Sequence, residues 1–530
     1  MTQTQSDRLR TFPLLSNILL ALLIIVLALI VLSQANPGIT LPGQDYGDRA
    51  YTGQQILLGK LPYKDIVLGK PPAIYYLNAL GLWAAHGLRW GIWAIEFIAL
   101  IAAIGLSYLL MKKLWGVFPA LCGILIWTYG LNLTLQGGNN TEEFPLPLHF
   151  LSLILFLKLV DSPKNHWNNL LLGSAFAISF LFRENNAAVE TAIVLVLVFI
   201  QIWGKNFRTL FIALTWMAIG LLIPILATVL YFWSKGILKE MYVGSFAVPL
   251  DYSETKFSGL PLGLGGFQAL GFAGWFSLIG YVLALILWIK HRHEPSSAIL
   301  LLLVVGFPLT VVTSDLSQRS YPHYFINWLP FVALLSGLTF HMVQSKLALY
   351  LKSTAGADMF YVGLALAITA FVFIQSGEAS QNWTAFANVL NRSAIERRSV
   401  ISVYAEENTR PGELVLFWGG FPGENFMARR ASPNAIPYPR MFDSGLSKKI
   451  SDQFLLDLTN NRPTLIVDMD YTKSLSLDPK KRAAQLAAHQ GWPYLPANIN
   501  QVFEFINQNY HVEITFRNAT VYRLNGTSGP

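Results

Sequence analysis

The chain has 530 residues, of which 53% are hydrophobic and only 13% are charged, and its formal net charge is +8. Its apolar residues form blocks of about 18 or more, the length that a helix needs to cross the hydrocarbon core of a bilayer. This pattern excludes a string of soluble domains. The basic residues stand in short groups between the blocks, which argues against a nucleic-acid surface. The single cysteine, Cys122, excludes a disulfide framework and a thiolate metal site.

The first apolar block, residues 14–32, is predicted to span the membrane. Arg8 and Arg10 precede it, so the positive-inside rule places the N-terminus in the cytoplasm and the loop at residues 33–89 outside. The block is too long for the apolar region of a typical signal peptide, and no clean small-x-small cleavage site follows it. Residues 73–87, within the loop, are apolar but short, which favours a helix that lies at the membrane interface.

Ten further spans follow in the sequence. They are predicted at residues 90–110, 117–133, 145–160, 170–182, 187–203, 210–233, 270–289, 298–313, 325–340 and 359–374. The Gly-, Tyr- and Pro-rich stretch at residues 235–268 is predicted to be a loop. With this count, the dense basic clusters fall on one side of the membrane and the acidic or histidine-bearing loops fall on the other. If one span were miscounted, every later loop would change sides and this separation of charge would be lost. We therefore predict a polytopic α-helical protein of the plasma (inner) membrane with about eleven transmembrane helices.

Residues 377–530 differ from the rest, because they are charged and contain no spanning block. Two short apolar runs bounded by Gly or Pro, at residues 412–418 and 463–468, are typical of buried strands, and residues 512–524 predict a hairpin. Helical patterns lie near residues 385–407, 446–459 and 480–489. We therefore predict a soluble extracytoplasmic α/β domain at residues 377–530, after a transmembrane domain at residues 1–376.

The loops predicted on the outer face collect ionisable residues next to apolar blocks. They supply Asp45, Asp48, Asp65, Lys70, Glu142, Glu143, Arg183, Glu184, Asp315, Arg319 and His323. Charge at headgroup depth costs free energy unless it is paired or faces a wet cavity, and a single such charge is more often a topology signal or a snorkelling side chain. A cavity with both carboxylates and cations suits a lipid that carries a phosphate. Cations neutralise a leaving phosphate, and a carboxylate accepts the proton of an incoming hydroxyl.

Several outer segments resemble the GT-C membrane glycosyltransferases. Asp45 is followed by G-Q-Q-I-L-L-G-K-L-P-Y-K-D at residues 53–65 and by K-P-P-A-I-Y-Y-L-N at residues 70–78. This pattern looks like the first outer loop of the branch that holds the protein O-mannosyltransferases and the aminoarabinose transferases of lipid A. G-G-N-N-T-E-E at residues 137–143 is similar to the second loop of a bacterial subgroup, and R-S-Y-P-H-Y-F-I-N-W-L-P at residues 319–330 is similar to the late outer loop.

The resemblance covers roughly residues 10–375. It implies an inverting transfer of a sugar from a polyprenyl-phosphate donor to an extracytoplasmic acceptor, whether glycan, lipid or protein. It also implies that Asp45 is the general base and that Lys70 contacts the donor phosphate. The candidate site adds Arg319 and His323 for the donor phosphate, and Glu142, Glu143, Asp48 and Arg183 for the sugar or the acceptor. If the reaction uses a divalent cation, Glu142 and Glu143 are its expected ligands, and no other cofactor is implied.

The first loop also departs from the family pattern. Asp45 and Asp48 are spaced D-x-x-D rather than D-x-D, and Leu68-Gly69 stand before Lys70, where many relatives carry an acidic residue or His. No metal site is therefore predicted in this loop. The alternative function is a transporter or flippase of lipid-linked saccharides, which would carry charges or broken helices near the bilayer midplane. Because the predicted spans are nearly free of charge, the enzyme is favoured, with a membrane-lipid donor and no nucleotide-sugar or nucleic-acid partner.

Overall fold

The computed structural model describes residues 3–253, 263–292, 294, 297–316, 319–350, 396–435, 445–469, 474–488 and 498–527. The chain divides into two compact units. The first unit comprises Met1–Asn36, Trp93–Thr228 and Phe257–Ser393, and the second comprises Pro37–Ile92, Val229–Lys256 and Ala394–Pro530. The predicted boundary between residues 376 and 377 lies outside the described residues, so the division into those two domains remains a prediction.

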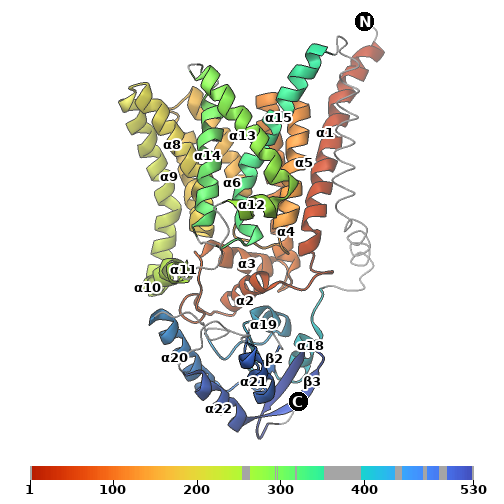
Figure 1. The fold of residues 1–530 in the computed structure, drawn as a ribbon, viewed down its shortest axis with the longest axis vertical. Coiled ribbons are helices and arrows are strands. Elements are labelled where there is room, and N and C mark those ends of the chain that lie inside the picture. The colour runs from red at the N-terminus through yellow and green to blue at the C-terminus, as the bar shows by residue number, and fades with distance from the viewer. Residues whose placement is uncertain are drawn as a thin grey trace. The chain divides into compact units, whose positions relative to one another are not determined.

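The first unit is a bundle of long apolar helices (Figure 1). Its helices are α1 (Gln3–Val31), most of α4 (Trp90–Trp115), α5 (Val117–Thr134), α6 (Leu146–Asp161), α7 (His166–Phe182), α8 (Ala188–Trp203), most of α9 (Phe207–Ser234), α12 (Leu264–Leu270), α13 (Phe272–His291), α14 (Ser297–Asp315) and α15 (Leu329–Tyr350). Short 3₁₀ turns connect some of them, namely η1 (Leu32–Ala35), η2 (Glu184–Ala187) and η4 (Pro322–Trp328).

Eight helical segments within the described ranges are long and apolar enough to cross a bilayer. Helices α6 and α7 are shorter, with 16 and 17 residues, and the span predicted at residues 359–374 lies outside the described residues. The polytopic α-helical membrane protein predicted from the sequence is therefore confirmed. The number eleven and the orientation in the membrane remain predictions.

Glycines let two helices of the bundle approach closely. A Cβ atom at Gly173 of α7 would lie 2.0 Å from the Met217 carbonyl oxygen of α9, and one at Gly220 of α9 would lie 2.0 Å from the Leu170 carbonyl oxygen of α7. In lipid, where hydrophobic burial does not drive helix association, such close backbone packing stabilises the pair. Any larger side chain at either glycine would push the two helices apart.

A buried ionisable pair joins two helices of the bundle. His149 of α6 and Glu190 of α8 are fully buried, and His149 Nδ1 lies 3.0 Å from Glu190 Oε1. Ser152 Oγ donates a hydrogen bond to the same oxygen at 3.0 Å. Ionisable side chains inside a membrane bundle are costly unless they pair with one another, so this contact joins α6 to α8.

The second unit combines the first loop, a short middle segment and the C-terminal part of the chain. The first loop forms α2 (Gln44–Leu57) and α3 (Ala73–Ala84), and the middle segment forms α10 (Leu238–Tyr242), the π-helical turn η3 (Val243–Ala247) and α11 (Val248–Ser253). Helix α3 is the short apolar helix predicted within residues 73–87. The stretch at residues 235–268 was expected to be a loop, but most of its described residues belong to short helices.

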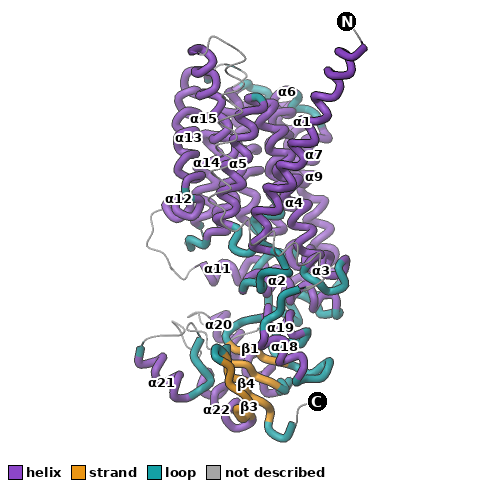
Figure 2. The backbone as a smooth tube through the Cα atoms, turned by 90° about the vertical axis from the view of Figure 1, so that its right-hand side faces the viewer, coloured by secondary structure: helices purple, strands orange, loops and turns teal. Residues whose placement is uncertain are grey.

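The C-terminal part of the second unit is an α/β structure. Its elements are α18 (Val400–Glu407), β1 (Val415–Trp418), α19 (Pro422–Ala428), α20 (Gly445–Asn460), β2 (Leu465–Asp468), α21 (Pro479–Ala487), α22 (Ile499–Asn509), β3 (Tyr510–Phe516) and β4 (Ala519–Leu524). The strands, orange in Figure 2, form one sheet in the order β1-β2-β4-β3. Strands β1 and β2 are parallel, and β4 pairs antiparallel with β2 and β3. The two predicted strands and the predicted hairpin are thus confirmed.

Alternation along β1 explains the layers of this structure. Leu416 and Trp418 pack into a core with residues of α20 and α22, whereas Val415 and Phe417 pack into a second core with residues of α18 and α19. Successive side chains of a strand point to opposite faces of its sheet, and all four residues are buried. A strand that is apolar at every position therefore needs helices on both faces, as parallel strands usually have.

The N-terminus of α21 offers a pH-dependent test of local stability. Asp478 accepts hydrogen bonds from the backbone N–H groups of Lys481 at 3.0 Å and Lys480 at 2.7 Å, and these bonds hold the pKa of its carboxyl below the ordinary value. A group with a depressed folded pKa stabilises the protein above its unfolded pKa, and this contribution is lost as the pH falls through the folded value. We therefore expect hydrogen exchange across residues 479–487, corrected for the intrinsic rate, to rise below about pH 4.

The matched control is Asp478→Asn, whose amide oxygen accepts the same bonds but does not titrate. This variant is expected to keep its exchange protection at low pH. An equal loss of protection in both proteins would show that the cap is not the cause.

Candidate active site

Helix α2 presents the first candidate, Asp45, in its first turn. The helix begins after Gly43, and a carboxylate near a helix N-terminus is favoured by the unpaired N–H groups there. Arg49, one turn further on, is 1% exposed, and its Nη2 lies 2.7 Å from Asp45 Oδ2. Lys70 Nζ lies 3.5 Å from the same oxygen. The Asp45 side chain is 55% exposed and that of Lys70 is 25% exposed, so both are open to a ligand.

The structure therefore brings together Asp45 and Lys70, which are far enough apart in sequence that only the fold determines their distance. Helices α2 and α3 make this possible by packing closely, since a Cβ atom at Gly53 would lie 2.8 Å from the Ala79 backbone nitrogen. Two cations, Arg49 and Lys70, therefore lie against the same oxygen of the Asp45 carboxylate.

Tyr63 fixes the backbone at Lys70. Its hydroxyl donates a hydrogen bond of 2.8 Å to the Lys70 carbonyl oxygen, and its ring is buried. The π-helical turn η3 covers this ring, because a Cβ atom at Gly244 would lie 2.4 Å from Tyr63 Cδ1 and 2.8 Å from the Leu68 carbonyl oxygen. Tyr63 itself has a φ of 69°, an uncommon backbone conformation for an aromatic residue. The loop before Lys70 is thus held in place through the Tyr63 side chain and through its own backbone.

Other charged residues of the first loop differ in their exposure and contacts. Asp48 is half-buried on α2, one turn from the start of the helix. Asp65 accepts a hydrogen bond of 2.7 Å from the Leu61 backbone N–H and so closes a turn. Lys64 is exposed.

A second group of candidates lies in the first unit, around Arg183. Its guanidinium forms an ion pair with Glu142 Oε1 and lies 3.9 Å above the ring of Tyr324. Glu142 is fully buried, and Thr141 Oγ1 donates a hydrogen bond of 2.8 Å to its other oxygen, Oε2. Both carboxylate oxygens of Glu142 are therefore engaged by the protein. In this arrangement Glu142 orients Arg183, and Arg183 is only 13% exposed.

His323 extends this group. Its Nδ1 lies 3.0 Å from Gln136 Oε1, and its ring meets the Tyr324 ring edge-on with centroids 4.8 Å apart. Tyr324 thus contacts both His323 and Arg183. Arg319 and Glu143 are also buried, with relative exposures of 5% and 7%.

The loop that carries Gln136 and Glu142 has an unusual backbone held by Glu96. Residues 136–139 all have positive φ, between 50° and 91°, and two of them are glycine. Glu96 of α4 is buried and accepts a hydrogen bond from the Asn139 backbone N–H. A Cβ atom at Gly138 would lie only 2.6 Å from Glu96 Oε1. Glu96 was not among the predicted residues, although a single acid inside an apolar helix is a recognisable signal.

The predicted site residues therefore fall into two groups, one in each unit. Asp45, Asp48 and Lys70 belong to the second unit, and Glu142, Glu143, Arg183, Arg319 and His323 belong to the first. Among the described residues, no three His, Cys, Asp or Glu side chains gather in a way that could hold a metal ion.

Comparisons with known proteins identify the class of protein. Residues 69–233 match the family model described as dolichyl-phosphate-mannose-protein mannosyltransferase. ArnT from Cupriavidus metallidurans bound to undecaprenyl phosphate has a TM-score of 0.58 at 14% identity, over 96% of this chain and 99% of that one. Its apo state has a TM-score of 0.55 at 13% identity, over 96% and 98%. The archaeal oligosaccharyltransferase AglB from Archaeoglobus fulgidus has a TM-score of 0.47 at 12% identity, over 86% and 70%. No curated protein sequence matches the chain.

The chain shares the ArnT fold along nearly its whole length, so it is a multi-pass membrane protein of GT-C architecture. Together with the family-model match over residues 69–233, this fold indicates a membrane glycosyltransferase. The resemblance noted in the outer loops is thereby confirmed.

Proposed function

We propose that the protein transfers a sugar from a polyprenyl-phosphate donor to an acceptor on the extracytoplasmic face, with inversion at the anomeric carbon. The observation that carries this proposal is the pair of Asp45 and Lys70, an exposed carboxylate 3.5 Å from a partly exposed ammonium group. The structure of ArnT that shares this fold is bound to undecaprenyl phosphate, which supports a donor of the same chemical class. The N-terminus is cytoplasmic and the C-terminal part extracytoplasmic in this proposal.

The reaction is a single displacement. An Asp45 oxygen accepts the proton of the acceptor hydroxyl, whose oxygen attacks the anomeric carbon as the bond from that carbon to the phosphate oxygen breaks. The negative charge that develops on the departing lipid phosphate is neutralised by Lys70. We assign Arg319 and His323 as further phosphate ligands.

Donor binding and base activation are linked through Lys70. In the structure its ammonium group pairs with Asp45 Oδ2, so an arriving phosphate competes with the carboxylate for this cation. When the phosphate takes Lys70, Asp45 retains its ion pair with Arg49 and loses one of the two cations that compete with a proton for its oxygen. The enzyme would therefore prepare its base only when the donor is present.

The sugar and acceptor assignments follow from the group around Arg183. Since both oxygens of Glu142 are engaged, we propose that Glu142 acts through Arg183 and that Arg183 meets the sugar or the acceptor. Glu143 and Asp48 complete this proposed set. A glycan, a lipid or a protein acceptor would fit these groups equally well.

The test uses the full chain in liposomes supplied with undecaprenyl phosphates that carry a hexose or an aminopentose, together with an envelope extract as acceptor source. We expect release of undecaprenyl phosphate from at least one donor and a product of opposite anomeric configuration. Consumption of a nucleotide sugar with no loss of any lipid donor would refute the proposal. Movement of the intact lipid-linked sugar across the bilayer, without cleavage, would support a flippase instead.

Replacing Lys70 with glutamine should weaken phosphate binding. A charge-assisted hydrogen bond contributes about 1.5–3 kcal/mol, so we expect the Kd for undecaprenyl phosphate to rise by about tenfold or more. The matched control is Lys64→Gln, which removes the same charge from an exposed position of the same loop. Binding is measured by the change in tryptophan fluorescence on titration with undecaprenyl phosphate. Equal affinities for the two variants would remove Lys70 from the donor site.

A further inference from the structure

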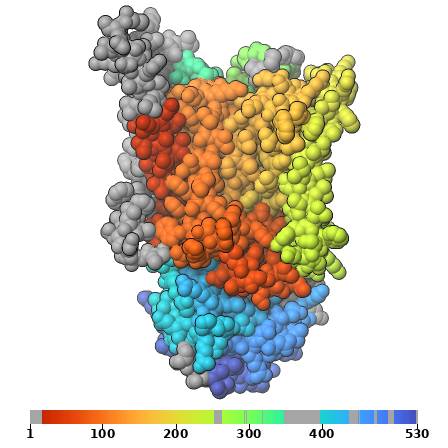
Figure 3. All heavy atoms as spheres, turned by 180° about the vertical axis from the view of Figure 1, so that it is seen from behind, coloured from red at the N-terminus to blue at the C-terminus, as the bar shows by residue number. Residues whose placement is uncertain are grey.

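The C-terminal part of the second unit meets α2 at a pair of glycines. A Cβ atom at Gly47 would lie 2.5 Å from Gly423 Cα, and a Cβ atom at Gly423 would lie 3.0 Å from Gly47 Cα. Gly423 belongs to α19, and Gly47 is two residues beyond Asp45 on α2. The two backbones therefore touch directly beside the proposed base. In Figure 3, the orange-red surface of the first loop borders the cyan surface of the C-terminal part.

Polar contacts extend this interface along α2. Gln44 Nε2 donates to the Gly420 carbonyl oxygen at 3.3 Å, and Gln54 Nε2 donates to the Phe426 carbonyl oxygen at 3.4 Å. The Tyr51 hydroxyl accepts a hydrogen bond of 2.9 Å from the Ser432 backbone N–H. Tyr51 is buried, and this burial raises the pKa of its phenol to about 12, so it stays neutral. Helix α2 is thus held near its start, its middle and its end.

The same part of the chain also holds the loop that leads to Lys70. The Val67 backbone N–H donates a hydrogen bond of 3.0 Å to the Ala435 carbonyl oxygen. Val67 is three residues before Lys70, and Ala435 is three residues after Ser432, which bonds to α2. One stretch of backbone therefore contacts both segments that carry the proposed site.

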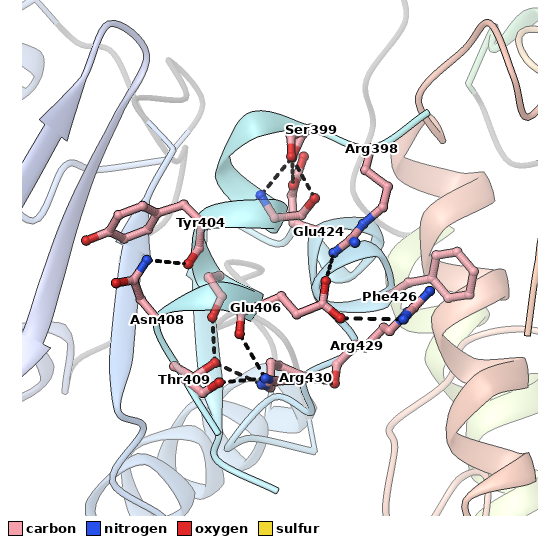
Figure 4. A network of polar contacts seen from close by, with 12 residues as sticks. Arg398, Ser399, Tyr404, Glu406, Asn408, Thr409, Glu424, Phe426, Arg429 and Arg430 are labelled. Carbon is pink, nitrogen blue, oxygen red and sulfur yellow. Dashed lines mark hydrogen bonds and ion pairs between the residues drawn. The ribbon is translucent and has the colours of Figure 1, made fainter. Parts of the chain in front are cut away.

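A charged network fixes this stretch internally (Figure 4). Glu406 of α18 forms an ion pair with Arg398 and lies 3.6 Å from Arg429 Nη1. Arg430 donates to the Glu406 carbonyl oxygen at 3.0 Å, to the Thr409 carbonyl oxygen at 2.6 Å and to Thr409 Oγ1 at 2.8 Å. Helix α19 is therefore tied to α18 from its C-terminal end.

The other end of α19 is tied by Glu424, the neighbour of Gly423. Ser399 Oγ donates a hydrogen bond to Glu424 Oε2, and the same hydroxyl caps α18 by accepting a bond of 2.9 Å from the Ser402 N–H. In Figure 4, Ser399 and Glu424 point toward each other from the two helices. Because both ends of α19 are held by polar contacts, α19 cannot shift along α2 at the Gly47–Gly423 contact without breaking them.

From these contacts we propose that residues 396–435 are a positioning brace, which sets the distance between Asp45 and Lys70 and so controls sugar transfer. The C-terminal part would then act on the reaction through α2 and the Val67 loop, without touching the substrate. This inference rests on the proposed function for the reaction step. The placement of α2 by the brace is independent of it and can be measured separately.

The experiment uses Gly423→Ala in the full chain, reconstituted with the lipid donor. The added methyl group would lie 3.0 Å from Gly47 Cα, so α19 and α2 must shift slightly apart, and even a displacement of about 1 Å at a reacting group can cost about 100-fold in rate. We expect kcat, normalised to the number of undecaprenyl-phosphate-binding sites, to fall by about tenfold or more while the donor KM stays within about twofold. Hydrogen exchange should rise across residues 44–57 and stay unchanged across residues 499–509.

The matched control is Gly105→Ala in α4, where a Cβ atom would also meet nothing within 4 Å. It should keep the wild-type rate and the wild-type hydrogen exchange.

Tyr51→Phe is the second variant, for use if Gly423→Ala does not fold. It removes one hydrogen bond from the brace without adding volume, and it should lower kcat by about threefold or more. A wild-type rate and wild-type exchange of residues 44–57 in the folded variant would overturn the brace. If the wild-type protein transfers no sugar from any lipid donor, the proposed function fails, and the exchange of residues 44–57 alone decides whether the brace exists.

Discussion

Replacing Asp45 with asparagine is expected to slow sugar transfer by about 10²–10⁴-fold at saturating donor, because the amide cannot accept the proton of the acceptor hydroxyl. The fold should survive the change. Asp45 is 55% exposed, and its ion pairs with Arg49 and Lys70 are therefore of limited value for stability. The loss should appear in kcat and in kcat/KM to a similar degree, since the proton moves only in the transition state.

The measurement is a single-turnover assay in liposomes, in which the released undecaprenyl phosphate is counted against the number of donor-binding sites. Glu407→Gln is the matched control, because it removes one carboxylate charge from an exposed position of the same unit. That variant should transfer sugar at the wild-type rate. Full transfer by Asp45→Asn would exclude Asp45 as the base and leave only the fold and the class of enzyme.

Replacing Arg89 with alanine is expected to cost the second unit about 3–5 kcal/mol of stability, because it leaves the Glu396 carboxylate, which is only 10% exposed, without this cation. Arg89 is 1% exposed, and its Nε lies 2.5 Å from Glu396 Oε1. Its Nη2 donates to the carbonyl oxygens of Pro37, Thr40 and Arg397 at 3.0, 2.9 and 3.2 Å. One guanidinium thus joins the start of the first loop, its end and the beginning of the C-terminal part.

The loss is measured as the shift in the denaturant midpoint of the protein in detergent micelles, followed by tryptophan fluorescence. Arg410→Ala removes an exposed arginine from the same unit and should change stability by less than about 0.5 kcal/mol. Glu396→Gln keeps a neutral acceptor for Arg89 and should cost less than Arg89→Ala. Equal midpoints for Arg89→Ala and Arg410→Ala would mean that the guanidinium does not hold these segments together.

The membrane class and the C-terminal strands could be predicted because both depend on local patterns. A long apolar block must be a helix in lipid, whatever the rest of the chain does. The apolar runs at residues 412–418 and 463–468 were short and bounded by Gly or Pro, and they became β1 and β2. Asp45 and Lys70 were chosen through the motif around them, and the structure places them 3.5 Å apart.

Other features could not be predicted, because they depend on partners far away in the sequence. Glu142 was expected to meet the sugar or the acceptor, but the structure shows both of its oxygens bound by the protein. Nothing in its local sequence distinguishes an acid that binds a ligand from one that orients an arginine. Glu96 is recognisable as a single acid inside an apolar helix, but its role exists only where the loop at residues 136–139 folds back onto α4.

The sequence by itself determined the helical membrane architecture and the α/β character of the C-terminal part. Hydrophobic length and period-2 alternation encode these features locally. Only the tertiary structure decided that Gly423 touches Gly47 and that Glu396 pairs with Arg89, since these pairs are separated by 376 and 307 positions. The physical reason is that the free-energy cost of a glycine or of a buried charge depends on the atoms that the folded chain places beside it. A local sequence pattern does not encode which atoms these are.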